Sequence, residues 1–260
     1  MISYCVAVYR PTYARLLVTD LCMKTVAPHE VLLWLNCDHA GFDAFLEDAQ
    51  AAGWPVRVLG RTPENLGMDV YLELFRASRY PLLVQIDDDV ICVCRGIAER
   101  AAQIFHRHRN LRQLVADVWQ DEYTTGARPE MSHYRLVDSR DGLYDGPIDG
   151  WFSIYHRSIL PLLPERFEGG YFPLGGMIKN LLRSRGLRGL LCTRMKVFHV
   201  IGPQYSSHFD MLDFEIAKYR RLGRQEIVDW YEEARQALPS PSELEKRVES
   251  IRAHLDGWQA

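Results

Sequence analysis

The stretch Leu82-Leu83-Val84-Gln85-Ile86-Asp87-Asp88-Asp89 decides the fold class of this 260-residue chain. Its first five residues are almost all apolar, which is typical of a β-strand buried on both faces of a sheet. Three adjacent carboxylates end it, and they repel one another unless a cation or strong hydrogen-bond donors lie nearby. Because side chains alternate along an extended segment, Asp87 and Asp89 point the same way and can share a ligand, while Asp88 points elsewhere.

This acidic strand end predicts a metal site. Carboxylate oxygens suit Mg²⁺ and Mn²⁺, and these ions commonly join protein carboxylates to phosphate groups. The position of Asp87 and Asp89 at the end of a buried strand favours metal ligation over the alternative, a solvated acidic turn.

Apolar runs and amphipathic segments alternate on the N-terminal side of this strand. Strands and helices are expected in alternating order at residues 3–9, 13–25, 31–35, 42–52, 55–59 and 68–78. Such alternation predicts a parallel sheet covered by helices, a Rossmann-like α/β core. Ligands of these sheets bind beyond the carboxyl ends of the strands, so the residues directly after each strand are the candidates for a site.

The second half of the chain is less regular. Its expected elements are a helix at 96–108, strands at 114–118, 151–155 and 195–200, and a polar loop over the sheet edge at 121–146. Helix follows helix from residue 211, and Ser240, Pro241 and Glu243 form a helix N-terminal signature. We expect one domain over 1–210, in two halves (1–105 and 106–210), with 211–260 as a helical appendage packed on it.

The composition excludes several classes of protein. Hydrophobic residues make up 47% and charged residues 25%, as in globular domains, and a net charge of −3 does not fit a strongly basic nucleic-acid-binding domain. Only five of the 31 basic residues are lysines, which indicates either genome bias or bidentate phosphate recognition by arginine. Six scattered cysteines, no signal-like N-terminus and no run of ~18 apolar residues predict a cytoplasmic protein without membrane insertion.

Several segments, in order, resemble the GT-A fold glycosyltransferases, most closely family 2. Glu64-Asn65-Leu66-Gly67 is similar to the N-x-G loop of that family, and Asp87-Asp88-Asp89 is similar to its D-x-D motif. The opening Val6-Ala7-Val8-Tyr9-Arg10-Pro11 resembles the first strand, and 31–38 resembles the second strand and the loop that touches the nucleoside. The resemblance is good over residues 2–105 and weaker at 146–157 and 169–202. It implies a mostly parallel central sheet flanked by helices, with 1–105 binding the nucleotide-sugar and 106–210 the acceptor.

The resemblance implies metal-dependent transfer of a sugar from a nucleoside-diphosphate sugar, most often UDP-linked, to an acceptor hydroxyl, with Mn²⁺ or Mg²⁺ as cofactor. The donor-binding residues expected on this basis are Tyr9, Arg10, Asn36, Asp38, Arg61, Asn65, Gly67, Asp87 and Asp88. The expected metal ligands are Asp87, Asp89 and His199, because the family often places a histidine at the end of a late strand. A core histidine is the alternative for His199, and His208 is the second candidate ligand.

The segment from Asp145 to Ile154 resembles the part of the family that lies under the acceptor. Gly150 is expected to let substrate approach closely, and Trp151 to stack on a sugar or base, although a tryptophan in an apolar strand is more often a core residue. The sugar is therefore expected to meet its acceptor here.

The acidic pair that deprotonates the acceptor in inverting members is absent from residues 169–179. An acceptor hydroxyl still needs a general base for an in-line displacement, and Asp149 is the first candidate, before Asp145 and Glu168. Inversion is favoured by family frequency. Retention without such a base and loss of activity are the alternatives.

The acceptor is left open as a saccharide, a small metabolite or, as in phage-type relatives, a modified base in DNA. A DNA acceptor calls for a basic groove, and the loop whose charge fits carries Arg128, His133, Arg135 and Arg140. A degenerate GT-A scaffold without catalysis is the non-enzymatic alternative, and the intact aspartates argue against it. A nucleotidyltransferase is disfavoured because no glycine-rich loop follows the first strand.

Overall fold

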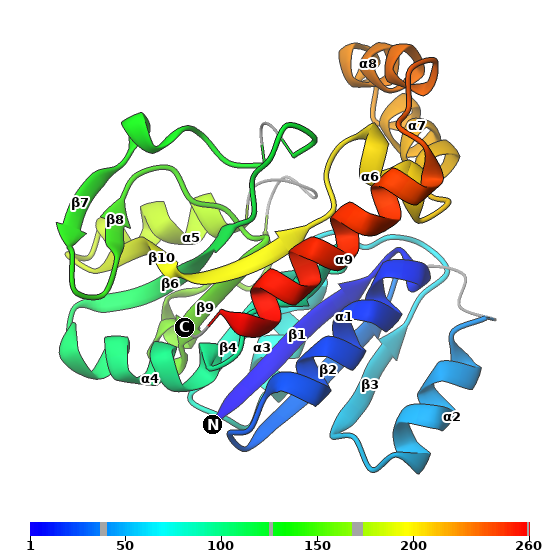
Figure 1. Ribbon diagram of the computed structural model, residues 1–260. Helices are drawn as coiled ribbons and strands as arrows, with labels where there is room; N and C mark the ends of the chain where they lie inside the picture. The colour runs from blue at the N-terminus through cyan, green and yellow to red at the C-terminus, as the bar shows by residue number, and fades with distance from the viewer. Residues whose placement is uncertain (37–40, 125–126, 168–173, 259) are drawn as a thin grey trace.

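The computed structural model describes residues 1–36, 41–124, 127–167, 174–258 and 260, and these form one α/β structure (Figure 1). The strands are β1 (Ile2–Val8), β2 (His29–Leu35), β3 (Val56–Arg61), β4 (Leu82–Asp87), β5 (Val90–Val93), β6 (Leu111–Val118), β7 (Arg135–Asp138), β8 (Leu143–Asp145), β9 (Phe152–His156) and β10 (Arg188–His199). The helices are α1 (Pro11–Lys24), α2 (Asp43–Ala51), α3 (Asp69–Ala77), α4 (Ile97–Arg107), α5 (Leu174–Arg183), α6 (Pro203–His208), α7 (Leu212–Arg221), α8 (Gln225–Arg235) and α9 (Pro241–Gly257), with 3₁₀ turns at Met131–His133 and Arg157–Leu162.

The described strands form one sheet in the order β3-β2-β1-β4-β9-β6-β10-β8-β7, and β5 pairs with β10. β1 lies between β2 and β4, parallel to both, and β2 is parallel to β3. β9 runs antiparallel to both β4 and β6, while β10 runs parallel to β6. Most strands therefore point the same way, with β5, β8 and β9 reversed. The predicted mostly parallel sheet flanked by helices is confirmed.

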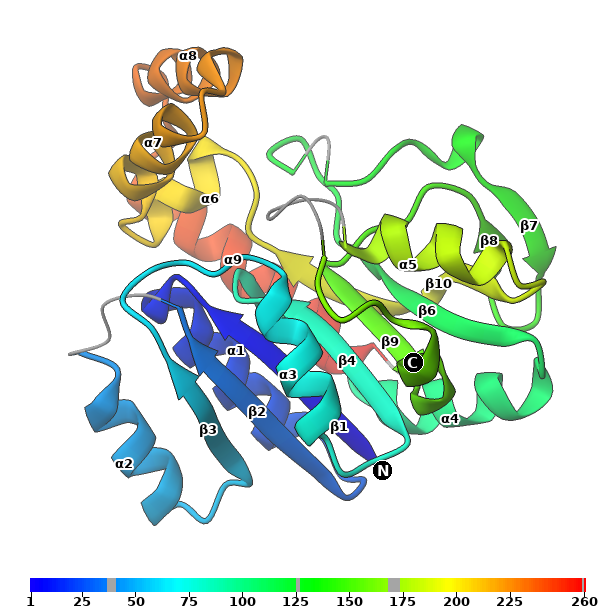
Figure 2. The same ribbon diagram turned by 180° about the vertical axis from the view of Figure 1, so that it is seen from behind.

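Helices cover both faces of the sheet. One face packs against α1, α4 and α9 and the other against α3 and α5, which face the viewer in Figure 2. The alternation along β1 explains the two layers, because Tyr4 and Val6 enter the first core while Cys5 enters the second. Among the described residues, no helix has the length and apolar character needed to cross a membrane.

The C-terminal helices lie beyond the carboxyl end of β1, and α9 then runs back across the sheet (Figure 1). α7 and α8 share a small core of Ile216, Val228 and Tyr231, whereas Val248 and Leu255 of α9 belong to the main core. The predicted start of α9 is confirmed, since the Ser240 hydroxyl accepts a hydrogen bond from the backbone N–H of Glu243.

Three details of the sheet differ from the sequence-based expectation. Residues 121–146 were expected to be a loop, but they include β7 and β8, a hairpin that extends the sheet edge beside β10. The expected strand at 195–200 begins already at Arg188, and its pairing with β6 shifts between Cys192 and Lys196. The short strand β5 was not expected. Strands of three or four residues, and a strand with a shift in register, give too little regular alternation to be recognised.

Candidate active site

The candidate residues lie together along the edge of the sheet that is formed by the carboxyl ends of its parallel strands. β1, β2 and β4 are parallel neighbours, so their carboxyl ends lie together, and β9 begins at the same edge because it runs antiparallel to β4. Asp87 ends β4, and its backbone N–H bonds the carbonyl of Trp151 just before β9. β10 brings His199 to this edge, where the backbone N–H of Val200 bonds the Asp89 carbonyl.

Asp87, Asp89 and His199 form a compact group. One potential ligand atom from each lies within 4.8 Å of the others, and the Nε2 of His199 lies 3.0 Å from Oδ1 of Asp89. The Nδ1 atom of His199 is buried and has no hydrogen-bond partner among the described residues, and the Asp87 carboxylate makes no ion pair with any of them. Two carboxylates and one imidazole, whose second ring nitrogen is unsatisfied, are a donor set that fits Mn²⁺ or Mg²⁺.

Asp88 points away from this group, as the strand alternation predicts. Its carboxylate accepts hydrogen bonds from the backbone N–H groups of Tyr9 and Arg10 and from the Arg10 side chain. The buried Asp88 thus holds the end of β1 against the end of β4. Because both oxygens of Asp88 accept hydrogen bonds, Asp88 holds Tyr9 and Arg10, two of the expected donor-binding residues, in position.

Arg10 links the aspartates to the C-terminal helices. Its Nη1 lies 2.6 Å from Oδ2 of Asp89 and 3.0 Å from Oε1 of Glu215 on α7, and its Nη2 lies 2.6 Å from Asp88. The guanidinium of Arg10, whose side chain is 12% exposed, has enough donors to serve all three carboxylates at once. Arg10, two residues after the end of β1, therefore supplies a positive charge directly at the aspartates.

The surroundings of the two candidate carboxylate ligands shift their pKa values in opposite directions. Burial raises the pKa of Asp87 to about 7, and the charge of Asp89 adds to this effect. Burial also raises the pKa of Asp89, but the charges of Arg10 and His199 outweigh it and hold that pKa well below its usual range. Burial lowers the pKa of His199, whereas the charge of Asp89 and its hydrogen bond raise it, and the net direction is upward.

Asp87 lies between two hollows in the surface of the described chain. The larger has a volume of about 680 Å³. Besides Asp87, the residues that line it include Tyr9, Asn36, Asn65, Gly67, Lys218 and Arg221. The smaller, of about 480 Å³, has walls that include Asp87, Asp149 and His199. Two ligands, one in each hollow, would therefore approach each other beside the metal-fitting group.

Comparison with known proteins identifies the architecture. No protein-family model and no curated relative matches the chain. Among solved structures, GalNAc-T7 with UDP, GalNAc and Mn²⁺ matches with a TM-score of 0.59 and 13% identity, over 78% of this chain and 43% of that chain. Staphylococcus aureus TarS 1–349 matches with a TM-score of 0.57 and 12% identity, over 88% of this chain and 70% of that chain. TarS 1–349 with UDP-GlcNAc matches with a TM-score of 0.53 and 14% identity, over 83% and 64%.

The chain has the GT-A fold. This confirms the predicted fold class. The chain spans less than half of GalNAc-T7, and identities of 12–14% show likeness of fold alone.

Within this GT-A chain, the N-x-G loop is held in shape by hydrogen bonds of two asparagines, Asn65 in the loop and Asn36 at the end of β2. The Nδ2 of Asn36 donates to Oδ1 of Asn65 over 2.6 Å, and Oδ1 of Asn36 accepts from the backbone N–H of Leu66 over 2.8 Å. Oδ1 of Asn65 also accepts from the backbone N–H of Gly67, whose φ of 67° is in the left-handed region that glycine adopts without strain. Asn36 therefore joins the end of β2 to the loop, and both border the larger hollow.

One of the expected donor-binding residues, Arg61, is not brought to this hollow. Arg61 lies at the end of β3, where its Nη1 pairs with Oδ1 of Asp43 on α2 over 2.7 Å, and it is not among the described residues that border the larger hollow. A partner from a neighbouring helix thus takes the side chain that was expected to reach a phosphate. Asp38 lies outside the described residues.

The candidate bases Asp149 and Asp145 have different surroundings. Asp149 borders the smaller hollow and accepts a hydrogen bond from the backbone N–H of Gly150, while the N–H groups of Gly175 and Gly176 at the start of α5 act to lower its pKa. Burial raises the pKa of Asp149, and these N–H groups offset the rise only in part. Asp145 pairs with Lys179 over 2.9 Å, and although burial raises its pKa, this partner lowers it further, so Asp145 is the weaker base. Glu168 lies outside the described residues.

Gly150 and Trp151 have packing roles beside the smaller hollow. A Cβ atom on Gly150 would lie 2.0 Å from the Nε2 of Gln85, so the missing side chain leaves room for β4. Trp151 is 6% exposed, and its indole N–H donates to the carbonyl of Ala116 over 2.7 Å. Both residues border the hollow, but the indole is held as a core side chain, which is the alternative that the sequence analysis left open for it.

The two candidate histidines lie in different surroundings. His208 on α6 packs against Phe209, at 4.6 Å between ring centroids, and is not part of the described group around Asp87. His199 is therefore the histidine that the fold brings to the aspartates.

In the basic loop, Arg128 pairs with the buried Asp117 and Arg135 pairs with Asp145, so part of the expected positive surface is neutralised.

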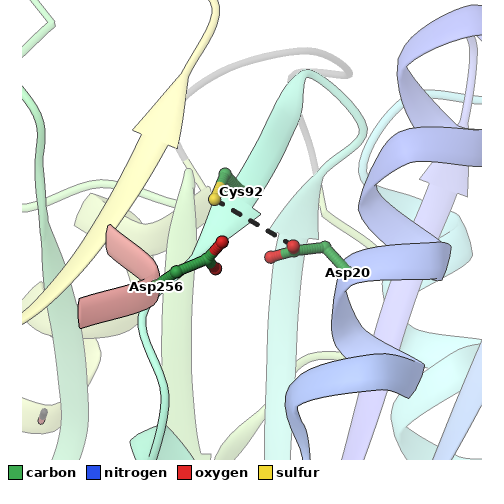
Figure 3. A group of neighbouring side chains, drawn as sticks. All are labelled: Asp20, Cys92 and Asp256. Carbon is green, nitrogen blue, oxygen red and sulfur yellow. Dashed lines mark hydrogen bonds between the residues drawn. The ribbon is translucent and has the colours of Figure 1, made fainter. Parts of the chain in front are cut away.

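Another group of potential ligands already holds a cation. Figure 3 shows Asp20 of α1 and Asp256 of α9 pointing toward Cys92 of β5. The Nζ of Lys24 lies 2.8 Å from Asp20, 2.6 Å from Asp256 and 3.1 Å from the Sγ of Cys92. The ammonium group thus occupies the place that a metal ion would take, and the cluster ties α9 to α1.

The sequence analysis missed Lys218 and Arg221 on α7, which border the larger hollow. The only local signal was a basic last turn, and basic side chains at a helix C-terminus are common because they complement the helix dipole. Nothing in that pattern indicates which part of the sheet they face.

Proposed function

We propose that this chain is a metal-dependent glycosyltransferase that transfers a sugar from a UDP-linked donor to an acceptor hydroxyl. The observation that carries the proposal is the group of Asp87, Asp89 and His199 between two adjoining hollows. UDP or a UDP-sugar is present in the solved structures of GalNAc-T7 and TarS, which share the fold. Buried free thiols among the described cysteines support a reducing, cytoplasmic location as part of the proposal.

In this proposal the donor lies in the larger hollow. Asn36, Asn65 and Gly67 border the side of the hollow that would hold the nucleoside, and Asp87 lies at the side that would face the diphosphate. A divalent ion held by Asp87, Asp89 and His199 would neutralise the charge that develops on the leaving diphosphate. Asp88 and Arg10 keep the ligand-bearing strand ends in place.

The acceptor lies in the smaller hollow, where Asp149 acts as general base. The Asp149 carboxylate takes the proton of the acceptor hydroxyl, the hydroxyl oxygen forms a bond to the anomeric carbon, and the bond from that carbon to the diphosphate oxygen breaks. Attack from the side opposite to the leaving group inverts the configuration. The raised pKa of Asp149 suits this role, since a carboxylate with a higher pKa is a stronger base.

The metal role is tested with Asp89→Asn, which keeps the size of the side chain. The variant is expected to lose Mn²⁺-dependent UDP release from a panel of UDP-sugars, while its circular dichroism spectrum is unchanged. Chelation of the wild-type protein with EDTA should have the same effect, and Mn²⁺ should reverse it. Full turnover by Asp89→Asn, or complete silence of the wild-type protein with every donor, would contradict the proposal and favour a non-catalytic scaffold.

The base role is tested with Asp149→Asn against the matched control Asp145→Asn. Loss of a general base is expected to lower the transfer rate by about 10²- to 10⁴-fold, while the affinity for UDP and Mn²⁺ is unchanged. Asp145→Asn should transfer within about twofold of the wild-type rate, because its carboxylate is paired with Lys179. Proton NMR of the product reports inversion, and a retained configuration would rule out this role for Asp149.

A further inference from the structure

We infer that α7 is part of the donor site: Lys218 and Arg221 bind the diphosphate of the donor, and Glu215 is the positioning residue that orients them. The identity of the ligand as a nucleoside diphosphate rests on the proposed function. The involvement of α7 rests on separate observations, and an inorganic probe tests it without a nucleotide.

The first observation is the face that α7 presents. Lys218, Arg221 and Leu222 all border the larger hollow together with Asp87. Residues three and four positions apart lie on the same face of a helix, so this face of α7 is turned toward the aspartates. Arg220, on the same turn, lies outside the hollow among the described residues and pairs instead with Glu232 on α8.

The second observation is a buried carboxylate that fixes this orientation. Glu215 is 3% exposed, and it pairs with Lys218 on its own helix and with Nη1 of Arg10 over 3.0 Å. Arg10 in turn pairs with Asp88 and Asp89. A buried carboxylate is unfavourable unless it is paired, so this chain of ion pairs sets the position of α7 relative to the end of β4.

The third observation concerns Arg221. Its Nη2 donates to the hydroxyl of Tyr9 over 2.7 Å, and the Tyr9 ring packs against Phe214 of α7 with 5.3 Å between the ring centroids. Tyr9 directly follows β1 and borders the same hollow. This contact holds the guanidinium at the hollow and uses one of its five N–H donors, which leaves a planar fork of the kind that binds phosphate.

The charge balance gives these cations a function. The three aspartates and Glu215 outnumber Arg10 at this edge of the sheet, so a diphosphate that entered the larger hollow would meet an excess of negative charge. A divalent ion offsets part of this repulsion. Lys218 and Arg221 offset the rest from α7, where their charges attract the phosphate oxygens.

The test is calorimetric titration of the full chain with Mn²⁺ and three probes: UDP, inorganic pyrophosphate and uridine. Lys218→Met and Arg221→Gln are each expected to weaken UDP and pyrophosphate binding by about tenfold, and the double variant by about a hundredfold. Arg220→Gln is the matched control and should stay within about twofold of wild type. Uridine has no phosphate, so its affinity should be the same in every variant.

Titration of Mn²⁺ alone, followed by electron paramagnetic resonance, separates this inference from the proposed function. The α7 variants should bind Mn²⁺ as the wild type does, whereas Asp89→Asn should not. Wild-type levels of pyrophosphate binding in the double variant would overturn the α7 inference and leave the glycosyltransferase proposal intact. A wild-type protein that binds pyrophosphate but releases UDP from no sugar donor would overturn the proposed function and retain α7 as a phosphate site. A wild type that binds no pyrophosphate overturns the inference.

Glu215→Gln tests the positioning role. If Glu215 orients Lys218, its neutralisation should weaken pyrophosphate binding by several fold at unchanged uridine affinity, and Glu215→Asp should restore part of the loss. If Glu215 only competes with phosphate for Lys218, the same variant should bind pyrophosphate more tightly. That result would remove the positioning role.

Discussion

Asp87 carries its carboxylate into the space between the two hollows, where burial and the charge of Asp89 raise its pKa to about 7. A metal ion must therefore displace a proton from Asp87 in much of the protein below pH 7. The pKa of His199 is also raised, and an imidazolium cannot coordinate a metal. Both groups lose their protons as the pH rises, so their effects on metal binding have the same sign.

We predict that the affinity for Mn²⁺ increases as the pH is raised from 6 to 8, by up to about tenfold per unit for each proton displaced, and levels off above that range. Calorimetry in buffers of different ionisation enthalpy measures both the affinity and the protons released. Asp145→Asn, which leaves the three candidate ligands in place and removes a charge that is paired with Lys179, should show the same profile. An affinity that does not change between pH 6 and 8 would be inconsistent with a protonated Asp87.

The residue scale also shows where sequence-based prediction works and where it fails. The opposite directions of Asp87 and Asp88 follow from the period of a strand, so they could be predicted. The partners of Arg61 and Trp151 could not. Arg61 pairs with a residue of α2 and Trp151 bonds a carbonyl of β6, and neither contact leaves a trace in the local sequence.

At the scale of elements, the packing of α9 on α1 depends on an internal cation. Lys24 is buried at the C-terminal end of α1, and it pairs with both Asp20 and Asp256. Removing one partner of a buried ion pair leaves an uncompensated charge, whereas a pair with an exposed partner contributes little.

We predict that Lys24→Met lowers the free energy of unfolding by about 3 kcal/mol, because Asp20 is then left without its counter-ion. Asp256→Asn is the comparison, and since Asp256 is 49% exposed it should cost less than about 1 kcal/mol. Urea titration measures both values. Equal losses in the two variants would mean that Asp20 does not depend on Lys24.

Elements differ in how well the sequence reveals them. The strands from β1 to β4 and the helices between them have the lengths and patterns that predict an α/β unit, and the start of α9 has its own capping signal. β5, β7 and β8 are too short for a pattern. α7 could be predicted as a helix, but the face it turns toward Asp87 depends on the pairing of Glu215 with Arg10, two residues far apart in the chain.

At the scale of the whole molecule, we propose that residues 211–260 are an appendage that cannot be separated from the 1–210 domain. Val248, Ile251 and Leu255 of α9 are buried in the main core, and each contributes about 2 kcal/mol when removed from water. Their sum is comparable with the total stability of a domain, about 5–15 kcal/mol.

A chain that ends at residue 210 is therefore expected to lose cooperative unfolding and the dispersed amide NMR spectrum of a folded protein. Leu255→Ala in the full chain provides the graded comparison and should cost about 2–5 kcal/mol while the protein stays folded. A truncated chain with a cooperative urea transition would show that the boundary separates two independent units. UDP titration of such a folded fragment would then measure the contribution of α7 directly.

The scarcity of lysine gives the molecule a spectroscopic advantage. The chain contains only five lysines, and Lys24 is buried among its partners. Reductive methylation with ¹³C-formaldehyde preserves the positive charge of each amine and adds an NMR-active label, so the labelled protein would give a handful of resolved signals. One of them belongs to Lys218 at the larger hollow. A change in its chemical shift would report the binding of each ligand at α7 without an engineered probe. In a protein with many surface lysines, overlapping signals would obscure this one.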